Sequence, residues 1–225
     1  MTRRLSPPSK SVVLFFGLLS LLVLGWLAAM RLPTDMMDQA FAEGGPVEAT
    51  SVVFLALAFL ILAVDMVRSG ERARWHLALL TAALALRELD MDKALTQHGI
   101  LSARLYSGSA PLEQKIAGAF AIAALVWASL RLLRRDLLPW IAALRRKQSW
   151  AWLSFTAFGL YCVAKTLDGA ARKLATWGIA LSDDHSRLTS LAEEGLELVA
   201  AIVLLLSVLG WQRRRRLSRC GRMYS

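Results

Sequence analysis

Six long runs of apolar residues constrain this chain more than any other feature of its sequence. A transmembrane helix needs about 20 predominantly apolar residues to cross about 30 Å of hydrocarbon. The chain has 225 residues, of which 56% are hydrophobic, which excludes an ordinary soluble domain. An all-α polytopic membrane protein with six transmembrane helices is therefore predicted, with spans at about residues 11–30, 47–67, 75–95, 116–133, 150–168 and 191–211.

The runs are continuous and rich in Leu and Ala, so they lack the alternation of apolar and polar residues that a membrane β-barrel requires. The first run follows a short basic stretch, as a signal peptide would, but no convincing small-residue cleavage site follows it. We expect a retained first helix.

The distribution of charge between the runs predicts the orientation of the chain, because Lys and Arg are retained on the cytoplasmic side. The segments on the side of the two termini hold 18 of the 27 basic residues and three of the 17 acidic residues. Both termini are therefore predicted to be cytoplasmic. The basic pI then reflects topology, and no nucleic-acid partner is predicted.

Two segments between or after the spans are predicted to lie at the membrane surface. Residues 134–149 carry an apolar stripe flanked by Arg and Lys, which is typical of an interfacial amphipathic helix. Residues 212–225 form a basic tail that anchors the topology and can bind anionic lipid headgroups. Cys162 lies in a span and Cys220 in this tail, so neither a disulfide nor a cysteine zinc site is predicted.

Carboxylates recur near the same predicted depth in several spans. Counting about 1.5 Å per residue from the cytoplasmic boundary places the acids of the third and sixth spans beyond the midplane of the bilayer. Ionisable groups inside a bilayer are costly unless they are paired or line a wet cavity, so this layer predicts a functional site. Its acidic residues are Glu48, Glu88, Asp90, Asp92, Asp168, Glu193, Glu194 and Glu197.

Helical spacing indicates which of these acids share a face. Glu88 with Asp92, and Glu193 with Glu197, are i,i+4 acid pairs that need a cation, a proton or a basic partner from elsewhere. We predict that the carboxylates bind a cation or act as general acid and base. The candidate catalytic residues are Glu88, Asp92, Glu194 and Glu197, and the candidate ligand-binding residues are Arg87, Asp90, Lys165, Asp168 and Glu48.

A structural interpretation competes with this one. Charges near a wet interface can form interhelical ion pairs, and an acid in the first turn of a helix is stabilised by the helix dipole. We favour that interpretation for Glu48 and Glu113. Arg87 and Lys165 would either neutralise the carboxylates or hold an anionic headgroup.

A divalent metal is a candidate cofactor, with His98 and His185 as the nitrogen ligands nearest to the acidic layer. His76 opens the third span at the opposite end and is predicted to be too far away. The sequence contains no HExxH, HxxxH or paired-His spacing, so a metal site would have to assemble from distant residues.

A weak internal repeat is also visible. RELDMDKALTQHGI at residues 87–100 can be laid on KTLDGAARKLATWGI at residues 165–179 with one inserted residue. Each segment is followed by an outer connection and by a helix that starts with acidic residues. The pattern predicts three repeated helical hairpins, and repeats in transporters place the binding site between repeat units.

EGGPVE at residues 43–48 and RELDMDK at residues 87–93 resemble small bacterial inner-membrane proteins that have an E-x-G-x-x-E start to the second helix and an RExD-type third helix. The resemblance covers about two helices. It implies a bacterial inner (plasma) membrane and transfers no catalytic residue. Membrane hydrolases resembling alkaline ceramidases are disfavoured, because this chain has three histidines in total and no HxxxH.

The leading hypothesis is an inner-membrane protein with an outward-facing polar cavity that binds or acts on a lipid or envelope precursor, with a cation. The first alternative is a proton-coupled carrier of small solutes. The second is a non-catalytic subunit whose charged layer docks a partner membrane protein or another copy of the chain. The sequence does not choose among them.

Overall fold

The computed structural model describes residues 34–42, 44–69, 74–96, 98–178, 180 and 182–222. Every regular element within these ranges is a helix, and none of them is a strand. The prediction of an all-α chain is therefore confirmed. The predicted first span, residues 11–30, lies outside the described residues.

Within the described residues, three helices are long and apolar enough to cross a membrane: α3 (Pro46–Ser69), α7 (Leu112–Arg135) and α11 (Asp183–Arg222). Their Leu- and Ala-rich sequences favour the helix locally. These helices indicate a membrane protein. The part of the predicted basic tail up to residue 222 is not a separate segment, because it continues α11.

The third and fifth apolar runs form shorter helices, α4 (Trp75–Glu88) and α9 (Ser149–Leu167). The chain over residues 75–95 is not one continuous helix, contrary to expectation. Asp90 has a φ of 46° and the chain resumes as α5 (Met91–Leu95). Because a left-handed residue cannot continue an α-helix, the depth counted along a straight third helix does not hold for Asp92.

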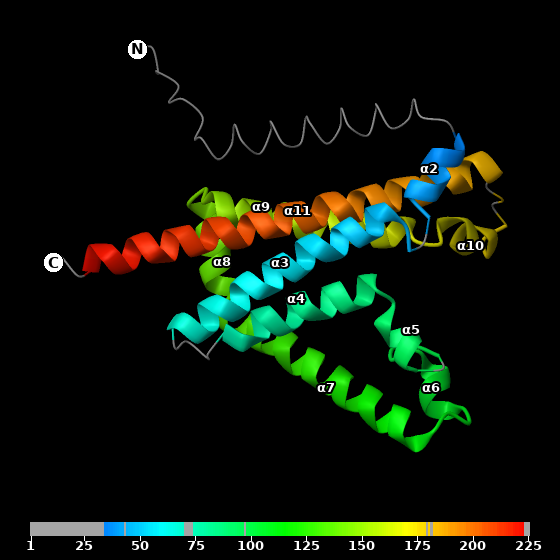
Figure 1. The fold of residues 1–225 in the computed structure, drawn as a ribbon, viewed down its shortest axis with the longest axis horizontal. Coiled ribbons are helices and arrows are strands. Elements are labelled where there is room, and N and C mark those ends of the chain that lie inside the picture. Colours follow the sequence, from blue (N-terminus) through cyan, green and yellow to red (C-terminus); the bar gives the residue numbers. More distant parts are fainter. Residues whose placement is uncertain are drawn as a thin grey trace, which may run out of the picture.

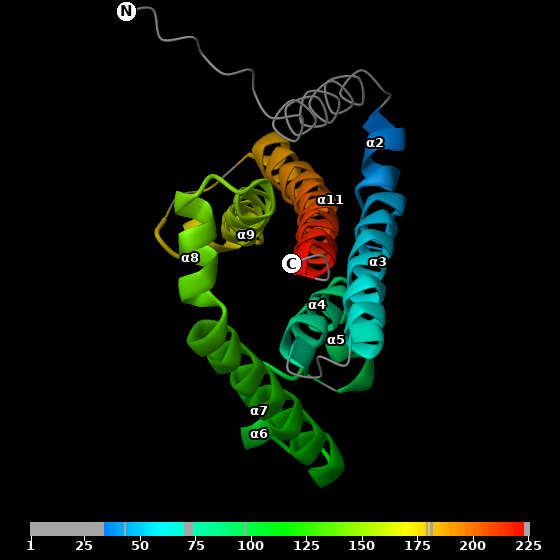
Figure 2. The same cartoon turned by 90° about the vertical axis from the view of Figure 1, so that its left-hand side faces the viewer.

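The helices lie side by side in the spatial order α9, α11, α3, α4, α7, with α11 packed between α9 and α3 (Figure 1). α8 (Leu137–Arg145), in the segment predicted to be interfacial, packs against both α7 and α9. Seen from the end, α7, α8 and α9 continue the row of helices into a ring (Figure 2).

Small side chains bring the central helices together. Ala200 and Ala201 of α11 and Ala164 of α9 are fully buried, and Ala201 packs with Leu55 of α3 and Ala85 of α4. Small residues let helix backbones approach closely, which is how helices associate in lipid. The core therefore lies where α3, α4, α9 and α11 meet.

Polar contacts fix α11 lengthwise against its neighbours. The Ser207 hydroxyl donates to the Trp150 carbonyl at 2.8 Å, and the Gln212 amide donates to the Ile61 carbonyl at 2.9 Å. Arg215 forms an ion pair with Asp65 of α3 at 2.9 Å. A lengthwise shift of α11 against α3 and α9 would leave these polar groups buried and unpaired, which is costly. The contacts therefore fix the register of α11.

The two segments of the weak repeat have similar backbones. α4 ends before left-handed Asp90, α5 follows, and Gly99 has a φ of 77°. α9 ends before Asp168 and left-handed Gly169 (φ 60°), α10 (Ala170–Ala175) follows, and Gly178 has a φ of 77°. This common geometry agrees with the alignment, and the three-hairpin repeat stays a prediction.

The connection between α5 and α7 contains α6 (Ala103–Ser107), which packs on α7 at a glycine. A Cβ at Gly118 would lie 2.8 Å from the Tyr106 hydroxyl and 2.9 Å from Cγ2 of Ile100. That hydroxyl donates to the Ile100 carbonyl at 2.7 Å, so the tyrosine is not free to swing away. Gly118 therefore permits the close approach of this connection.

We expect Gly118→Ala to lower the free energy of unfolding by about 1 kcal/mol, because overpacking costs about 1–3 kcal/mol and the better helix propensity of Ala offsets about 1 kcal/mol. Gly159→Ala on α9 is the matched control, since nothing lies within 4 Å of its added Cβ. It should be neutral or stabilising. Thermal unfolding of the two purified variants tests this, and equal melting temperatures would contradict the packing account.

Candidate functional site

Ionisable side chains from three helices meet at one end of the assembly. Glu88 is the last residue of α4, Lys165 lies in the last turn of α9, and α11 contributes three glutamates in its third and fourth turns. The ends of the helices, set by the backbone breaks after Glu88 and Leu167, bring these groups to a common level. We call Glu88, Lys165, Glu193, Glu194 and Glu197 the acid cluster.

Lys165 is the cation at the centre of the acid cluster. Its ammonium group forms an ion pair with Glu197 and lies 3.5 Å from Oε1 of Glu193. Oδ2 of Asp168 lies 3.9 Å away. Because Glu197 is only 3% exposed, its carboxylate needs this lysine.

Glu88 faces Glu197 across the junction of α4 and α11, with the two carboxyl groups within hydrogen-bonding range. Glu88 is 8% exposed, and its Oε1 is buried without a hydrogen-bond partner among the described residues. The buried hydroxyl of Tyr161, one turn before Lys165 on α9, also has no partner within that part of the chain. Buried polar atoms normally form hydrogen bonds, so each of these two atoms is able to form a further hydrogen bond.

Acids outnumber bases in this region. Half-buried Glu194 is within electrostatic range of Glu48, Glu193 and Glu197. Arg87, an exposed residue of α4, is close enough to interact electrostatically with Glu88 and Lys165. One lysine and one arginine therefore face several carboxylates.

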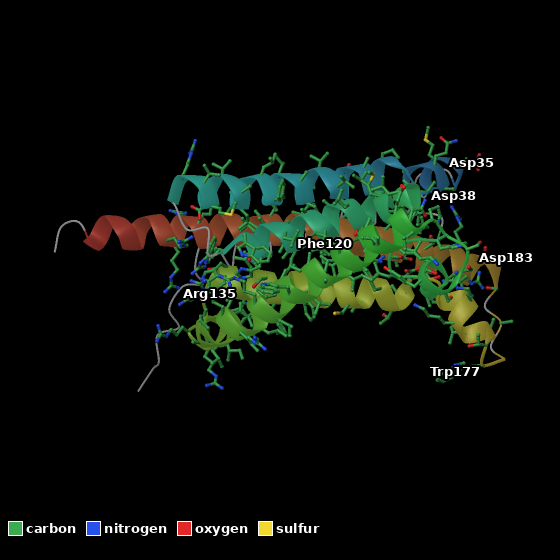
Figure 3. The ribbon with its side chains drawn as sticks, turned by 90° about the horizontal axis from the view of Figure 1, so that it is seen from below. Asp35, Asp38, Phe120, Arg135, Trp177 and Asp183 are labelled. Carbon is green, nitrogen blue, oxygen red and sulfur yellow. The ribbon has the colours of Figure 1, made fainter. Side chains whose placement is uncertain are left out.

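The acid cluster lies at one end of a cavity of about 1750 Å³ enclosed by α4, α7, α8, α9 and α11. Typical small-molecule pockets have volumes of about 300–1000 Å³. Figure 3 shows Phe120 on α7 between Arg135 at one end of the assembly and Asp183 at the other. The cavity walls are mostly apolar and include Leu84, Phe120, Leu125, Phe158, Leu204 and Val208.

Most of the predicted site residues line this one cavity. Those that do are Glu48, Arg87, Glu88, Asp90, Lys165, Asp168, Glu194 and Glu197. Asp90 is also paired with Lys93 at 2.8 Å, at the exposed edge of the site. The side chain of Asp92 lies outside the described residues, so its predicted role stays a prediction.

Glu48 has a structural role beside its place in the cavity wall. Its Oε2 accepts a hydrogen bond from the Gly44 backbone N–H at 2.6 Å, just before α3 begins. A Cβ at Gly45 would lie 2.7 Å from the Ala42 carbonyl oxygen, so only glycine fits there. The glycine and second glutamate of the E-x-G-x-x-E motif thus shape a helix start.

The structure does not bring the histidines into the acid cluster. His98 and His185 are exposed and absent from the cavity wall, and Nδ1 of His185 lies 2.6 Å from the Ser182 hydroxyl. Within the described ranges, no group of three or more His, Cys, Asp and Glu side chains is arranged to hold a metal ion. The metal site predicted at His98 and His185 therefore stays a prediction, and the carboxylates around Lys165 are the candidate site.

A second polar junction was missed by sequence reasoning. His76 is fully buried, and its Nε2 lies 2.7 Å from Oδ2 of Asp136, the residue between α7 and α8. Arg74 lies 4.0 Å from the same carboxylate. The pair ties the start of α4 to the joint of α7 and α8, at the opposite end of the cavity from the acid cluster. A histidine and an aspartate at ends of separate apolar runs were the signal that could have suggested it.

No family model matches this chain, and no curated protein or solved structure is significantly similar to it. Function must therefore be argued from the geometry and chemistry of the site.

We expect Lys165→Met to lower the free energy of unfolding by about 3 kcal/mol, because removing one partner of a buried ion pair leaves a charge uncompensated. Lys93→Met is the matched control. Its pair with Asp90 is exposed and should contribute at most about 1 kcal/mol. Thermal unfolding of the two purified lysine variants in detergent measures the difference in stability.

The double variant Lys165→Met/Glu197→Gln should recover part of the loss, because the carboxylate that lacked a partner is then neutral. Equal effects of the two lysine variants would show that Lys165 does not hold the acid cluster together.

Proposed function

We propose that this protein is a six-span bacterial inner-membrane protein whose intramembrane cavity binds an amphiphilic lipid or envelope precursor. The polar headgroup lies at the acid cluster and the hydrocarbon lies along the apolar walls. One observation carries the proposal: a large cavity has the acid cluster at one end, Arg74, Arg135 and Asp136 at the other, and apolar side chains along most of the length between them.

The charge pattern supports the proposed topology. The ends of the helices opposite the acid cluster carry Arg74, Arg135 and Arg215, and cytoplasmic flanks of membrane helices are rich in such residues. Both termini then lie in the cytoplasm, and the acid cluster faces the outer leaflet. The basic end of α11 is placed to meet anionic lipid headgroups.

The cavity walls suit a hydrocarbon chain. Phe120 of α7 is 76% exposed and Phe158 of α9 is 67% exposed, yet both line the cavity. Apolar side chains of this size suit contact with a hydrocarbon chain. A ligand arriving from the bilayer between α7 and α9 would cover them without leaving an apolar environment.

The acid cluster supplies the groups for acid–base chemistry on a bound headgroup. The carboxyl group of Glu88 lies beside that of Glu197, which is paired with Lys165, so a proton can be held or released between the two carboxyl groups. Lys165 positions Glu197, and Arg87 lines the cavity beside Glu88. An enzyme acting on the headgroup would use Glu88 as the acid or base.

The same carboxyl pair favours a second function, a proton-coupled carrier. Adjacent buried carboxyl groups from α4 and α11 would take up and release protons as those helices move apart. Uptake into vesicles that depends on a pH gradient would support the carrier, whereas headgroup turnover without a gradient would support an enzyme. A subunit that docks a partner membrane protein or a second copy would show neither.

We expect Ala117→Trp to reduce lipid retention at least tenfold, because Ala117 is exposed on α7 and lines the cavity near its charged end. Ala123→Trp is the matched control, since Ala123 is exposed on the same helix and does not line the cavity. Native mass spectrometry of both variants, purified from lipid nanodiscs, measures the bound lipid. Equal retention by the two variants would contradict binding in the cavity.

A further inference from the structure

We infer that the headgroup bound at the acid cluster is a zwitterion, with a primary ammonium facing the carboxylates and a phosphate facing Arg87. This inference rests on the proposed function, because it takes an amphiphile in the cavity as given. It adds the chemical class of the headgroup.

The charge of the acid cluster calls for a cation from outside the chain. Lys165 is already shared among Glu197, Glu193 and Asp168. Glu88 and Glu194 line the same cavity, and neither has an ion pair among the described residues. Opposite charges in a poorly solvated cavity attract strongly, so a second cation is favoured there.

The hydrogen-bonding groups specify what kind of cation fits. A primary ammonium has three N–H donors and no acceptor. Two buried atoms beside this end of the cavity have no hydrogen-bond partner among the described residues: Oε1 of Glu88, 8% of whose surface is exposed and which accepts when ionised, and the hydroxyl of Tyr161, which can accept or donate. A trimethylated ammonium carries charge but no donor, so it would leave these acceptors unsatisfied.

Arg87 supplies the partner for an anion on the same headgroup. It is exposed, lines the cavity next to Glu88, and has no ion pair or side-chain hydrogen bond within the described part of the chain. A guanidinium binds phosphate through two parallel hydrogen bonds. Arg87 and Glu88 both line the cavity at the end of α4 and lie within electrostatic range of each other, so one headgroup with neighbouring phosphate and ammonium can reach both.

The test is competition among lipids with identical acyl chains. Delipidated protein is placed in nanodiscs of phosphatidylethanolamine, phosphatidylcholine and phosphatidylglycerol in equal amounts, and native mass spectrometry identifies the lipid that stays bound. We expect phosphatidylethanolamine to be retained about tenfold over either of the others, which is the size of effect that losing one charge-assisted hydrogen bond produces.

Variants assign the preference to named groups. Glu88→Gln and Glu194→Gln should each abolish the preference for phosphatidylethanolamine, and Arg87→Gln should lower retention of all three phospholipids. Glu194 is only half-buried, so its variant serves if Glu88→Gln does not fold. Asp184→Asn is the control, because it removes a carboxylate from the exposed first turn of α11, away from the cavity wall.

The outcomes separate the two proposals. The unmodified protein could retain the three lipids equally while Ala117→Trp retains none of them. That result would overturn the ammonium inference and leave the cavity proposal standing. A preference for phosphatidylethanolamine that persists in Glu88→Gln and Glu194→Gln would also overturn it. Retention of no lipid by the unmodified protein would overturn both.

Discussion

The pairing of Lys165 with Glu197 is the interaction on which the candidate site depends. The two groups come from α9 and α11, and the glutamate is almost fully buried. A carboxylate at that position would be strongly destabilising without the lysine. The pair also sets the position of Glu88, which reaches the same carboxylate from α4. Three helices are thus joined at one level by the ion pair of Lys165 with Glu197 and by the additional carboxyl group of Glu88.

The cavity exists because the helices are packed unevenly. α9 and α11 meet along small residues, whereas α7 leans away from α11 and is held by α4, α8 and the short connection at Gly118 (Figures 1 and 2). Polar junctions at both ends keep this arrangement: the acid cluster at one end and His76 with Asp136 at the other. The space left between them is mostly apolar, with the acid cluster at one end and Arg74, Arg135 and Asp136 at the other.

The sequence predicted the helical class and the three described helices that are long and apolar enough to cross a membrane, since continuous apolar runs of this length have few alternatives. It did not predict where helices end inside those runs. The helix over residues 75–95 was expected to continue, yet Asp90 adopts a left-handed conformation and the chain turns into α5. Nothing in the local sequence demands that break, because Asp is tolerated in a helix and its choice of conformation depends on the surrounding contacts.

The sequence by itself determined that this chain is helical and suited to a membrane, and that acids gather near one level, because apolar length and charge position can be read along one dimension. Only the tertiary structure decided which of those acids meet. It joined Glu88 to Glu197 and Lys165, gave Glu48 a role at the start of α3, and left His98 and His185 at the surface. Which side chains meet depends on how the helices are rotated and packed against one another. Contacts between side chains fix that packing, whereas spacing along the chain does not.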